Sequence, residues 1–431
     1  MNLRDRQILY IALPSIVSNI TVPLLGLIDV AITGHLGSAA YIGAIAVGGM
    51  LFNIIYWMFA FLRMGTSGMT SQAFGARNLT EVVSVLLRAV FVSLFISAVM
   101  LSLQVPIREL SLSIIMPSEE VASFTRTYYN ICIWGAPAAL ALFVLTGWYV
   151  GMQNSRIPML VSITQNVANI VVSLMLVYGF GMKIEGVALG TVLAQYIGLG
   201  VAVVMLFRHY SRLRKYLCAK MVLTKEALLK FFFLNKDIFL RTCCLILVHF
   251  FFIAAGAKQG DTELAVNTML MQLFTLYSYI MDGFAFAGEA MVGKAIGAQM
   301  RGIYNETIRS LFRWGWGVAA LFTLAYFLLG KPFLSLLTDD AAVIEAAQVY
   351  QPWTLLFPLC GMAAFIWDGI YIGATATKGM LLSMASGMAV FFLLYFLLVP
   401  SFANHGLWMA FVAYLATRGI VQTAFRRKVW Q

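Results

Sequence analysis

Four acidic residues stand inside long apolar stretches of this 431-residue sequence, where charged side chains are otherwise scarce. They are Asp29, Asp282, Glu289 and Asp368. An ionisable side chain at membrane depth is costly, so it usually faces a cavity or a partner. A carboxyl group in such surroundings can take up and release a proton. The four acids are therefore candidates for proton transfer.

Asp29 is the first of these candidates. It lies in the run PSIVSNITVPLLGLIDVAITG, after Pro14 and Pro23. Because proline removes a backbone hydrogen bond and bends a helix, a bent helix beside a titratable carboxyl group could change shape on protonation. The alternative is that Asp29 only ends its helix near the lipid headgroups. We expect Asp29 to be a cation-coupling residue, one whose binding of a proton or a sodium ion is linked to a change in the protein's conformation.

Two later apolar runs supply uncharged polar groups. Asn169 is followed one turn later by Ser173, and Thr191 one turn later by Gln195. In a membrane helix such side chains often only join one helix to another by hydrogen bonds. Both interpretations, a coupling site with Asp29 and helix–helix packing, stay open.

The remaining acids are secondary candidates for the same role. Asp368, in FIWDGIYIGAT, either forms a structural ion pair or takes part in coupling. Asp282 and Glu289 are seven residues apart, which places them on one face of a helix. Arg63 is the base in the corresponding run of the other half, and we advance the hypothesis that it pairs with Asp282.

The composition indicates that the segments containing these residues are membrane-spanning helices. Hydrophobic residues make up 61% of the chain and charged residues 11%, against about 45–50% and about 25% in soluble domains. A soluble enzyme, a disordered chain and a disulfide scaffold are excluded. A membrane-spanning helix needs about 20 apolar residues, and the chain has about twelve such runs. The approximate ranges are 8–33, 41–75, 83–106, 122–152, 157–181, 185–207, 237–257, 262–298, 304–330, 346–375, 379–402 and 405–425.

The fold class expected is an all-α polytopic membrane protein with twelve transmembrane helices. The runs do not alternate apolar and polar residues, as the strands of a barrel would. The first run, beginning near Ile8, is too long for a cleavable signal and reads as a retained helix.

Lysine and arginine set the expected orientation. Most of the 29 basic residues fall at the termini or in every second loop, including the longest connection, 208–236. The opposite loops hold few: Arg108, Lys183, Lys258 and Lys331. By the positive-inside rule, both termini are expected in the cytoplasm. The localisation expected is the cytoplasmic (inner) membrane. These loops account for the net charge of +11, so no nucleic-acid partner is expected.

The two halves of the chain repeat at one constant offset, the one that separates Gly75 from Gly297. Gly147, Tyr149 and Gly151 match Gly369, Tyr371 and Gly373, and the same offset relates other pairs: Met69 and Met291, Ala73 and Ala295, Ala76 and Ala298, Arg156 and Lys378, Leu160 and Leu382. Six helices per copy give both copies the same orientation. The repeat predicts two pseudo-two-fold-related bundles, 1–207 and 237–431, around a central cavity, joined by a cytoplasmic amphipathic linker at 208–236. This architecture is typical of transporters.

Motifs for enzymatic or metal chemistry are missing from the sequence. None of the five cysteines has CxxC spacing, the four histidines are scattered, and HExxH and GxSxG do not occur. We expect no enzymatic activity, no cofactor and no metal site.

Three segments resemble the multidrug and toxic compound extrusion (MATE) transporters, in the branch of the DNA-damage-inducible protein F (DinF) proteins. They are FLRMGTSGMTSQAFGARN (61–78), EAMVGKAIGAQ (289–299) and FIWDGIYIGAT (365–375), and the resemblance covers essentially the whole chain. It implies secondary active efflux driven by a proton or sodium gradient.

The resemblance also implies roles for particular residues. Asp29 matches the first-span acid proposed to couple cations, and Asn169 and Thr191 match its fifth-span and sixth-span partners. Ser173 stands where related archaeal-type members have a second acid. Asp368 matches the tenth-span acid of sodium-coupled members, whereas their seventh-span glutamate has no match near Arg241 and His249. The coupling ion expected is H⁺, with Na⁺ as the other possibility.

The function expected is export of cationic or amphipathic drugs and toxic organic compounds in exchange for protons, by alternating access. The partners expected are these small molecules and membrane lipids, and the protein is expected to be a monomer. The alternative is a flippase of lipid-linked precursors with a related two-lobed fold.

Overall fold

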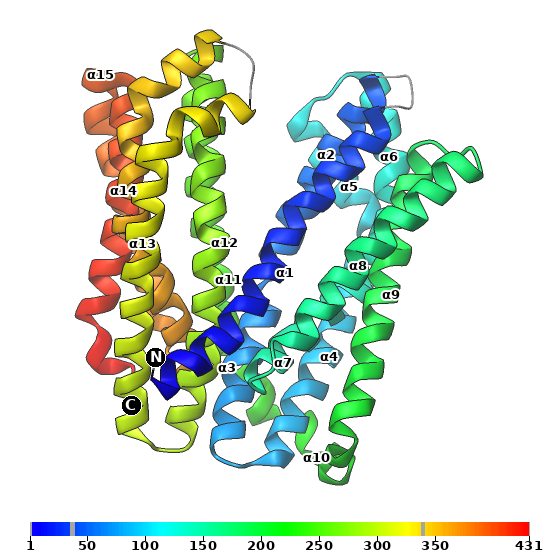
Figure 1. Cartoon of the computed structure of the whole chain (residues 1–431). Coiled ribbons are helices and arrows are strands. Elements are labelled where there is room, and N and C mark those ends of the chain that lie inside the picture. The colour runs from blue at the N-terminus through cyan, green and yellow to red at the C-terminus, as the bar shows by residue number, and fades with distance from the viewer. Residues whose placement is uncertain (1, 35–38, 338–340, 431) are drawn as a thin grey trace. The chain divides into compact units, whose positions relative to one another are not determined.

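Long helices make up the residues that this computed structural model describes, namely 2–34, 39–337 and 341–430 (Figure 1). No strand occurs within these ranges, and the expected all-α class is confirmed. The first half holds α1 (Leu3–Gly34), α2 (Ala39–Met58), α3 (Phe61–Gly75), α4 (Leu79–Ser102), α5 (Gln104–Ile115), α6 (Glu119–Cys132), η1 (Ile133–Gly135), α7 (Ala136–Gly151), α8 (Arg156–Leu174), η2 (Met175–Gly179), α9 (Ile184–Tyr210), η3 (Ser211–Tyr216) and α10 (Ala219–Val222). The second half holds α11 (Lys225–Ala257), α12 (Asp261–Gly297), α13 (Arg301–Leu337), α14 (Ala341–Gly373), α15 (Thr377–Ala424) and η4 (Arg426–Lys428).

The helices are long enough to cross a membrane many times. Over the described residues, ten helical stretches are sufficiently long and apolar to do so. Two of them combine consecutive α-helices, α2 with α3 and α6 with α7. The second break lies where Pro137 enters the first turn of α7, a position at which the missing N–H of proline costs little. The ten stretches include α15 once and leave out α1.

Helix α15 contains two of the expected spans. Ala403 has non-helical backbone angles, φ 47° and ψ −126°, three residues after Pro400. Tyr414 donates a hydrogen bond of 3.1 Å to the sulfur of Met384. A straight helix would hold residues thirty positions apart about 45 Å from each other. The chain therefore folds back near Ala403, which is where the sequence predicts the boundary between the last two spans.

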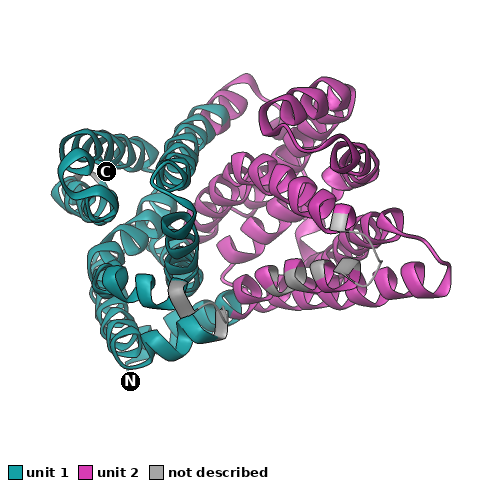
Figure 2. Ribbon diagram, turned by 90° about the horizontal axis from the view of Figure 1, so that it is seen from above, with its two compact units in different colours: residues 1–16, 232–431 teal, residues 17–231 magenta. Residues whose placement is uncertain are grey.

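The chain divides into two compact units (Figure 2). Unit 1 comprises residues 1–16 and 232–431, and unit 2 comprises residues 17–231. These limits differ from the expected division at 1–207, 208–236 and 237–431. Helix α1 starts in unit 1 because its first turns pack there: a Cβ on Gly283 of α12 would lie 2.9 Å from the carbonyl oxygen of Ala12.

The connection between the halves belongs largely to unit 2. Arg88 of α4, a fully buried residue, donates hydrogen bonds to the carbonyl oxygens of Val222 at 2.9 Å and Met221 at 3.2 Å. It also forms an ion pair with Glu81 at 3.3 Å. Arg88 thus attaches α10 to α4 and holds the first part of the expected linker against the bundle.

The internal repeat extends to backbone geometry. Left-handed backbone angles occur at Arg77 and Gln299, both with φ 56°, and at Gln153 and Thr375, with φ 65° and 55°. Both pairs are related by the repeat offset. Each of the four residues follows a helix end, where a left-handed residue commonly terminates a helix. The two halves therefore end corresponding helices in the same way.

Close helix packing follows the same repeat. A Cβ on Gly147 would lie 2.2 Å from the carbonyl oxygen of Arg63, and a Cβ on Gly369 would lie 2.2 Å from that of Ala285. Arg63 and Ala285 are themselves related by the repeat offset. Small residues let membrane helices approach closely in this way. The repeated glycines therefore bring α3 against α7 in unit 2, and α12 against α14 in unit 1.

The core of unit 1 is aromatic with one polar pair inside it. The ring centroids of Phe252 and Trp408 lie 4.7 Å apart. Asn267 and Asn404 exchange two hydrogen bonds of 2.8 and 2.9 Å, and Trp408 donates a third to Asn267 at 2.9 Å. Buried amides are stable in an apolar interior when they are paired in this manner.

Candidate functional site

Asp29 is buried in unit 2 near the far end of α1. Its side chain is 8% exposed, and among the described residues of unit 2 it is the only buried acid. Its charge acts electrostatically on Tyr128 and Cys132 of α6, both of which are also buried. The structure therefore places the first candidate in the interior of a bundle, and not at an exposed helix end.

Three of the other candidates come together where α8 meets α9. Asn169 donates a hydrogen bond of 3.1 Å to the hydroxyl of Thr191 and accepts one of 3.4 Å from Ser173. Asn169 and Ser173 are 1% and 0% exposed. The neighbouring Gly190 makes this approach possible, because a Cβ there would lie 2.1 Å from the Ser173 hydroxyl oxygen. The predicted set of Asn169, Ser173 and Thr191 is thus one hydrogen-bonded cluster.

The same face of α8 also contacts α1, which the sequence analysis missed. The hydroxyls of Ser162 and Thr21 lie 3.1 Å apart, and Asn166 donates a hydrogen bond of 3.2 Å to the carbonyl oxygen of Thr21. Ser162, Asn166, Asn169 and Ser173 follow one another by four, three and four positions, the spacing of a single helix face. That spacing is the signal that could have found the contact. Helix α8 therefore joins the Asn169 cluster to the helix that carries Asp29.

Asp368 lies in a different environment, inside unit 1. Arg418 donates a hydrogen bond of 2.7 Å to one carboxylate oxygen, and Arg241 pairs with the same oxygen. Gln422 donates a hydrogen bond of 2.5 Å to the other oxygen. The sequence left two interpretations of Asp368 open, a structural ion pair and a role in coupling. The structure shows the ion pair. Arg418 and Gln422 were missed, although their four-residue spacing on an apolar helix is a usable signal.

The last candidates are distributed between the two units. Glu289, 1% exposed, and Asp282, half-buried, lie on α12 of unit 1. Arg63 lies on α3 of unit 2. The pair expected between Arg63 and Asp282 joins residues of different units and stays a prediction.

The described side chains form no group of three histidine, cysteine, aspartate or glutamate residues that could hold a metal ion. The site that the geometry offers is instead one buried carboxyl group, Asp29, in the unit that contains a neutral polar cluster. A buried carboxyl group can bind a proton or a small cation.

Comparison with known families decides the class of protein. Residues 14–175 and 238–397 both match the model of the MatE family. The chain belongs to the MatE family. The two MatE matches end at positions 175 and 397, which are related by the offset of the internal repeat.

Individual MatE relatives match over most of this chain. It is 38% identical to the DNA damage-inducible protein F of Escherichia coli strain K12, over 99% of this chain and 93% of that protein. It is 23% identical to the probable multidrug resistance protein NorM of Thermotoga maritima, over 80% of this chain and 74% of that protein. The Vibrio cholerae MATE transporter VcmN in the bent form has the same fold, with a TM-score of 0.87 at 16% identity, over 99% of this chain and 97% of that one.

As a MatE protein, the chain is a multi-pass membrane transporter and not an enzyme. The resemblance noted in the sequence to the MATE transporters and to their DinF branch is confirmed.

Proposed function

We propose that this transporter exports cationic or amphipathic small molecules in exchange for protons. The observation that carries the proposal is the burial of Asp29 in unit 2, which contains the Asn169 cluster. The multidrug names of related transporters support the substrate class. MATE transporters act on small molecules, and a carboxyl group can carry a proton without any further cofactor.

The mechanism proposed begins with a proton binding Asp29 from outside the cell. In this mechanism, loss of the negative charge changes how Asp29 interacts with Asn169 and Thr191, and α1 bends. Helix α1 is suited to this role because residues 3–16 pack in unit 1 and residues 17–34 in unit 2. A cavity of the N-terminal bundle then favours substrate release outside, and return to the inward-open state delivers the proton to the cytoplasm.

Exchange requires that proton and substrate stabilise different states. If the proton and the substrate stabilised the same conformational state, the proton gradient could not drive export of the substrate. The contacts of α8 with Thr21 on one side and Thr191 on the other provide a physical route, because a shift of α1 must be accommodated at the same helix that holds the Asn169 cluster.

The test is transport in proteoliposomes with an imposed gradient. We expect a cationic dye such as ethidium to accumulate in vesicles whose lumen is acidic, without sodium, and a protonophore to abolish this accumulation. A sodium-loaded lumen at equal pH is expected to drive no uptake. Uptake driven by sodium alone would show that the coupling ion is wrong, and translocation of a labelled lipid headgroup without dye transport would favour the flippase.

We also propose that both termini face the cytoplasm, that the protein lies in the inner membrane and that it is a monomer. The described ends of the chain share one end of unit 1, because Arg4 pairs with Glu306 and Trp430 packs on Tyr304 near the start of α13. An impermeant thiol reagent should label Lys183→Cys in intact cells but not Arg427→Cys. Light scattering of the purified protein should give the mass of one chain.

A further inference from the structure

A surface groove in unit 1, made of two adjoining cavities, has a basic part and an apolar part. Its basic part, of about 740 Å³, lies between the start of α13 and the end of α15 and is lined by four exposed arginines: Arg301, Arg309, Arg426 and Arg427. Its apolar part, of about 700 Å³, runs between α14 and α15. The two cavities have Thr423, Arg426 and Arg427 in common, so they adjoin at these residues.

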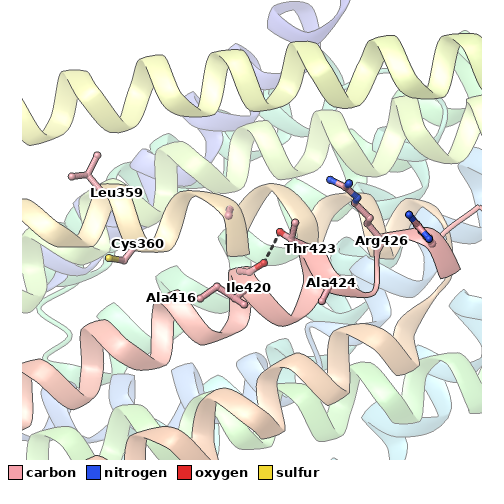
Figure 3. A pocket seen from close by; sticks show the side chains of 10 residues that line it. Leu359, Cys360, Ala416, Ile420, Thr423, Ala424 and Arg426 are labelled. Atoms are coloured by element: carbon pink, nitrogen blue, oxygen red, sulfur yellow. Dashed lines mark hydrogen bonds between the residues drawn. The ribbon is translucent and has the colours of Figure 1, made fainter.

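The apolar part lies along the membrane-spanning lengths of the two helices. Figure 3 shows Leu359 and Cys360 at one end and Arg426 at the other, with Ala416 and Ile420 between them. Ile420 is 68% exposed. Since α14 and α15 are long and apolar enough to cross a membrane, this exposed apolar side chain is suited to contact an acyl chain, and the groove runs from apolar side chains to arginines.

The basic part has the composition of a membrane–water interface. Trp430 packs against Tyr304 with ring centroids 4.9 Å apart, and the Arg301 guanidinium lies 5.9 Å from the Trp430 ring. Tryptophan and tyrosine concentrate at this level of membrane proteins. None of the described residues lining either part is acidic. The four arginines therefore present positive charge where a lipid headgroup would lie.

We propose that this groove binds an anionic phospholipid. The phosphate is held by Arg426 and Arg427 with Arg301 and Arg309, and one acyl chain lies along Leu359, Ala416 and Ile420. Arginine recognises phosphate through paired N–H donors, and basic pockets at helix ends are known to bind anionic headgroups. A free phosphate ion would bind the arginines and leave the apolar part unoccupied. A phospholipid has a headgroup that fits the basic part and an acyl chain that fits the apolar part.

The test measures lipid retention by the purified full-length protein. Native mass spectrometry is performed after addition of phosphatidylglycerol and phosphatidylethanolamine with identical acyl chains. The wild type should retain phosphatidylglycerol in preference. The double variant Arg426→Gln/Arg427→Gln should lower that retention about tenfold to thirtyfold, since each basic side chain near a headgroup contributes roughly the energy of a fivefold change in affinity.

Two further variants test the two ends separately. Arg208→Gln/Arg212→Gln makes the same change of charge at exposed positions of unit 2 and should leave retention unchanged. Ala416→Leu fills the apolar end without altering charge and should lower retention of the intact lipid. Transport is not measured, so the outcome is independent of the proposed exchange.

Three results would overturn the proposal. The first is equal retention by the wild type and the Arg426→Gln/Arg427→Gln variant, and the second is an equal loss in the unit 2 control. The third is displacement of the lipid by inorganic phosphate together with no effect of Ala416→Leu, which would assign the site to a free anion.

Discussion

Arg418 donates a hydrogen bond of 2.7 Å to Asp368 inside unit 1, and Arg241 pairs with the same carboxylate oxygen. Two cations thus lie against one anion, and all three residues are buried. The charge of Asp29 in unit 2 acts electrostatically on the buried side chains of Tyr128 and Cys132. The ion pairs support a structural role for Asp368, and the burial of Asp29 supports the proposal that Asp29 couples protons.

Replacement of Asp368 is expected to destabilise the protein. The Asp368→Asn variant leaves the Arg241 and Arg418 charges buried without their counter-ion, and removal of one partner from a buried ion pair typically costs about 3–5 kcal/mol. The measurement is thermal unfolding in detergent, followed by the loss of the monodisperse peak in size-exclusion chromatography. Asp29→Asn serves as the matched control and should unfold near the wild-type temperature. Equal stability of Asp368→Asn and wild type would contradict a structural role.

The repeated glycines should be intolerant of a methyl group in both units. Gly147→Ala and Gly369→Ala each place a Cβ 2.2 Å from a carbonyl oxygen of the facing helix, and such overpacking costs about 1–3 kcal/mol. Gly49→Ala and Gly317→Ala are the controls, since no atom lies within 4 Å of a Cβ at either position. Thermal unfolding should separate the two groups of variants. A similar result for Gly147→Ala and Gly49→Ala would mean that α3 and α7 are not in close contact.

The repeat can be recognised in the sequence because its glycines lie where two helices approach closely, and a larger side chain there would be destabilising. Gly147 and Gly369 face equivalent carbonyl oxygens, so both copies retain the same residue at the same offset. The fold class could be predicted from composition, because only helices and closed barrels form all their backbone hydrogen bonds in lipid. What the linear pattern could not give is the assignment of residues 1–16 to unit 1, which depends on contacts with α12 in the other half of the chain.

Arg88 should control the stability of the connection between the halves. Arg88→Met removes the donors to Val222 and Met221, and carbonyl groups left without partners cost about 1–3 kcal/mol. We expect α10 to detach from α4, so that trypsin cleaves at Lys215 and Lys225 faster than in the wild type. Arg77→Met, at an exposed position, provides the control. Unchanged cleavage would show that other contacts hold the connection.

Asp5 should make the anchoring of α1 dependent on pH. The main-chain N–H of Asn2, followed by Ser310, Trp314 and Arg313, holds the pKa of Asp5 below its usual value. A carboxyl group with a lowered pKa in the folded state contributes stability above its unfolded pKa of about 3.9, and this contribution is lost as the pH falls. Asp5→Asn should therefore lower the unfolding temperature at pH 7.

The difference between wild type and Asp5→Asn should shrink as the pH is lowered below about 4. Glu306→Gln is the control, because the ion pair of Glu306 with Arg4 is exposed and contributes little. If the difference between wild type and Asp5→Asn were the same at pH 7 and below pH 4, the ionised carboxylate would not be what anchors α1.

The candidate site was only partly accessible to sequence reasoning. Asn169, Ser173 and Thr191 were found because polar residues are conspicuous in apolar helices, and they do form one cluster. Thr21, which joins α1 to α8 partly through its main-chain oxygen, was not found. A backbone acceptor is present at every position, so residue type alone could not single it out.

The most direct test of the central claim compares wild type with Asp29→Asn in proteoliposomes with an acidic lumen and a cationic dye outside. Asparagine has nearly the same size as aspartate but does not ionise, so the variant should fold and should retain dye binding. The account predicts that its proton-driven dye uptake falls to the level of protein-free vesicles, while Ser173→Ala retains measurable uptake. Full proton-driven uptake by Asp29→Asn would contradict the assignment of Asp29 as the coupling residue.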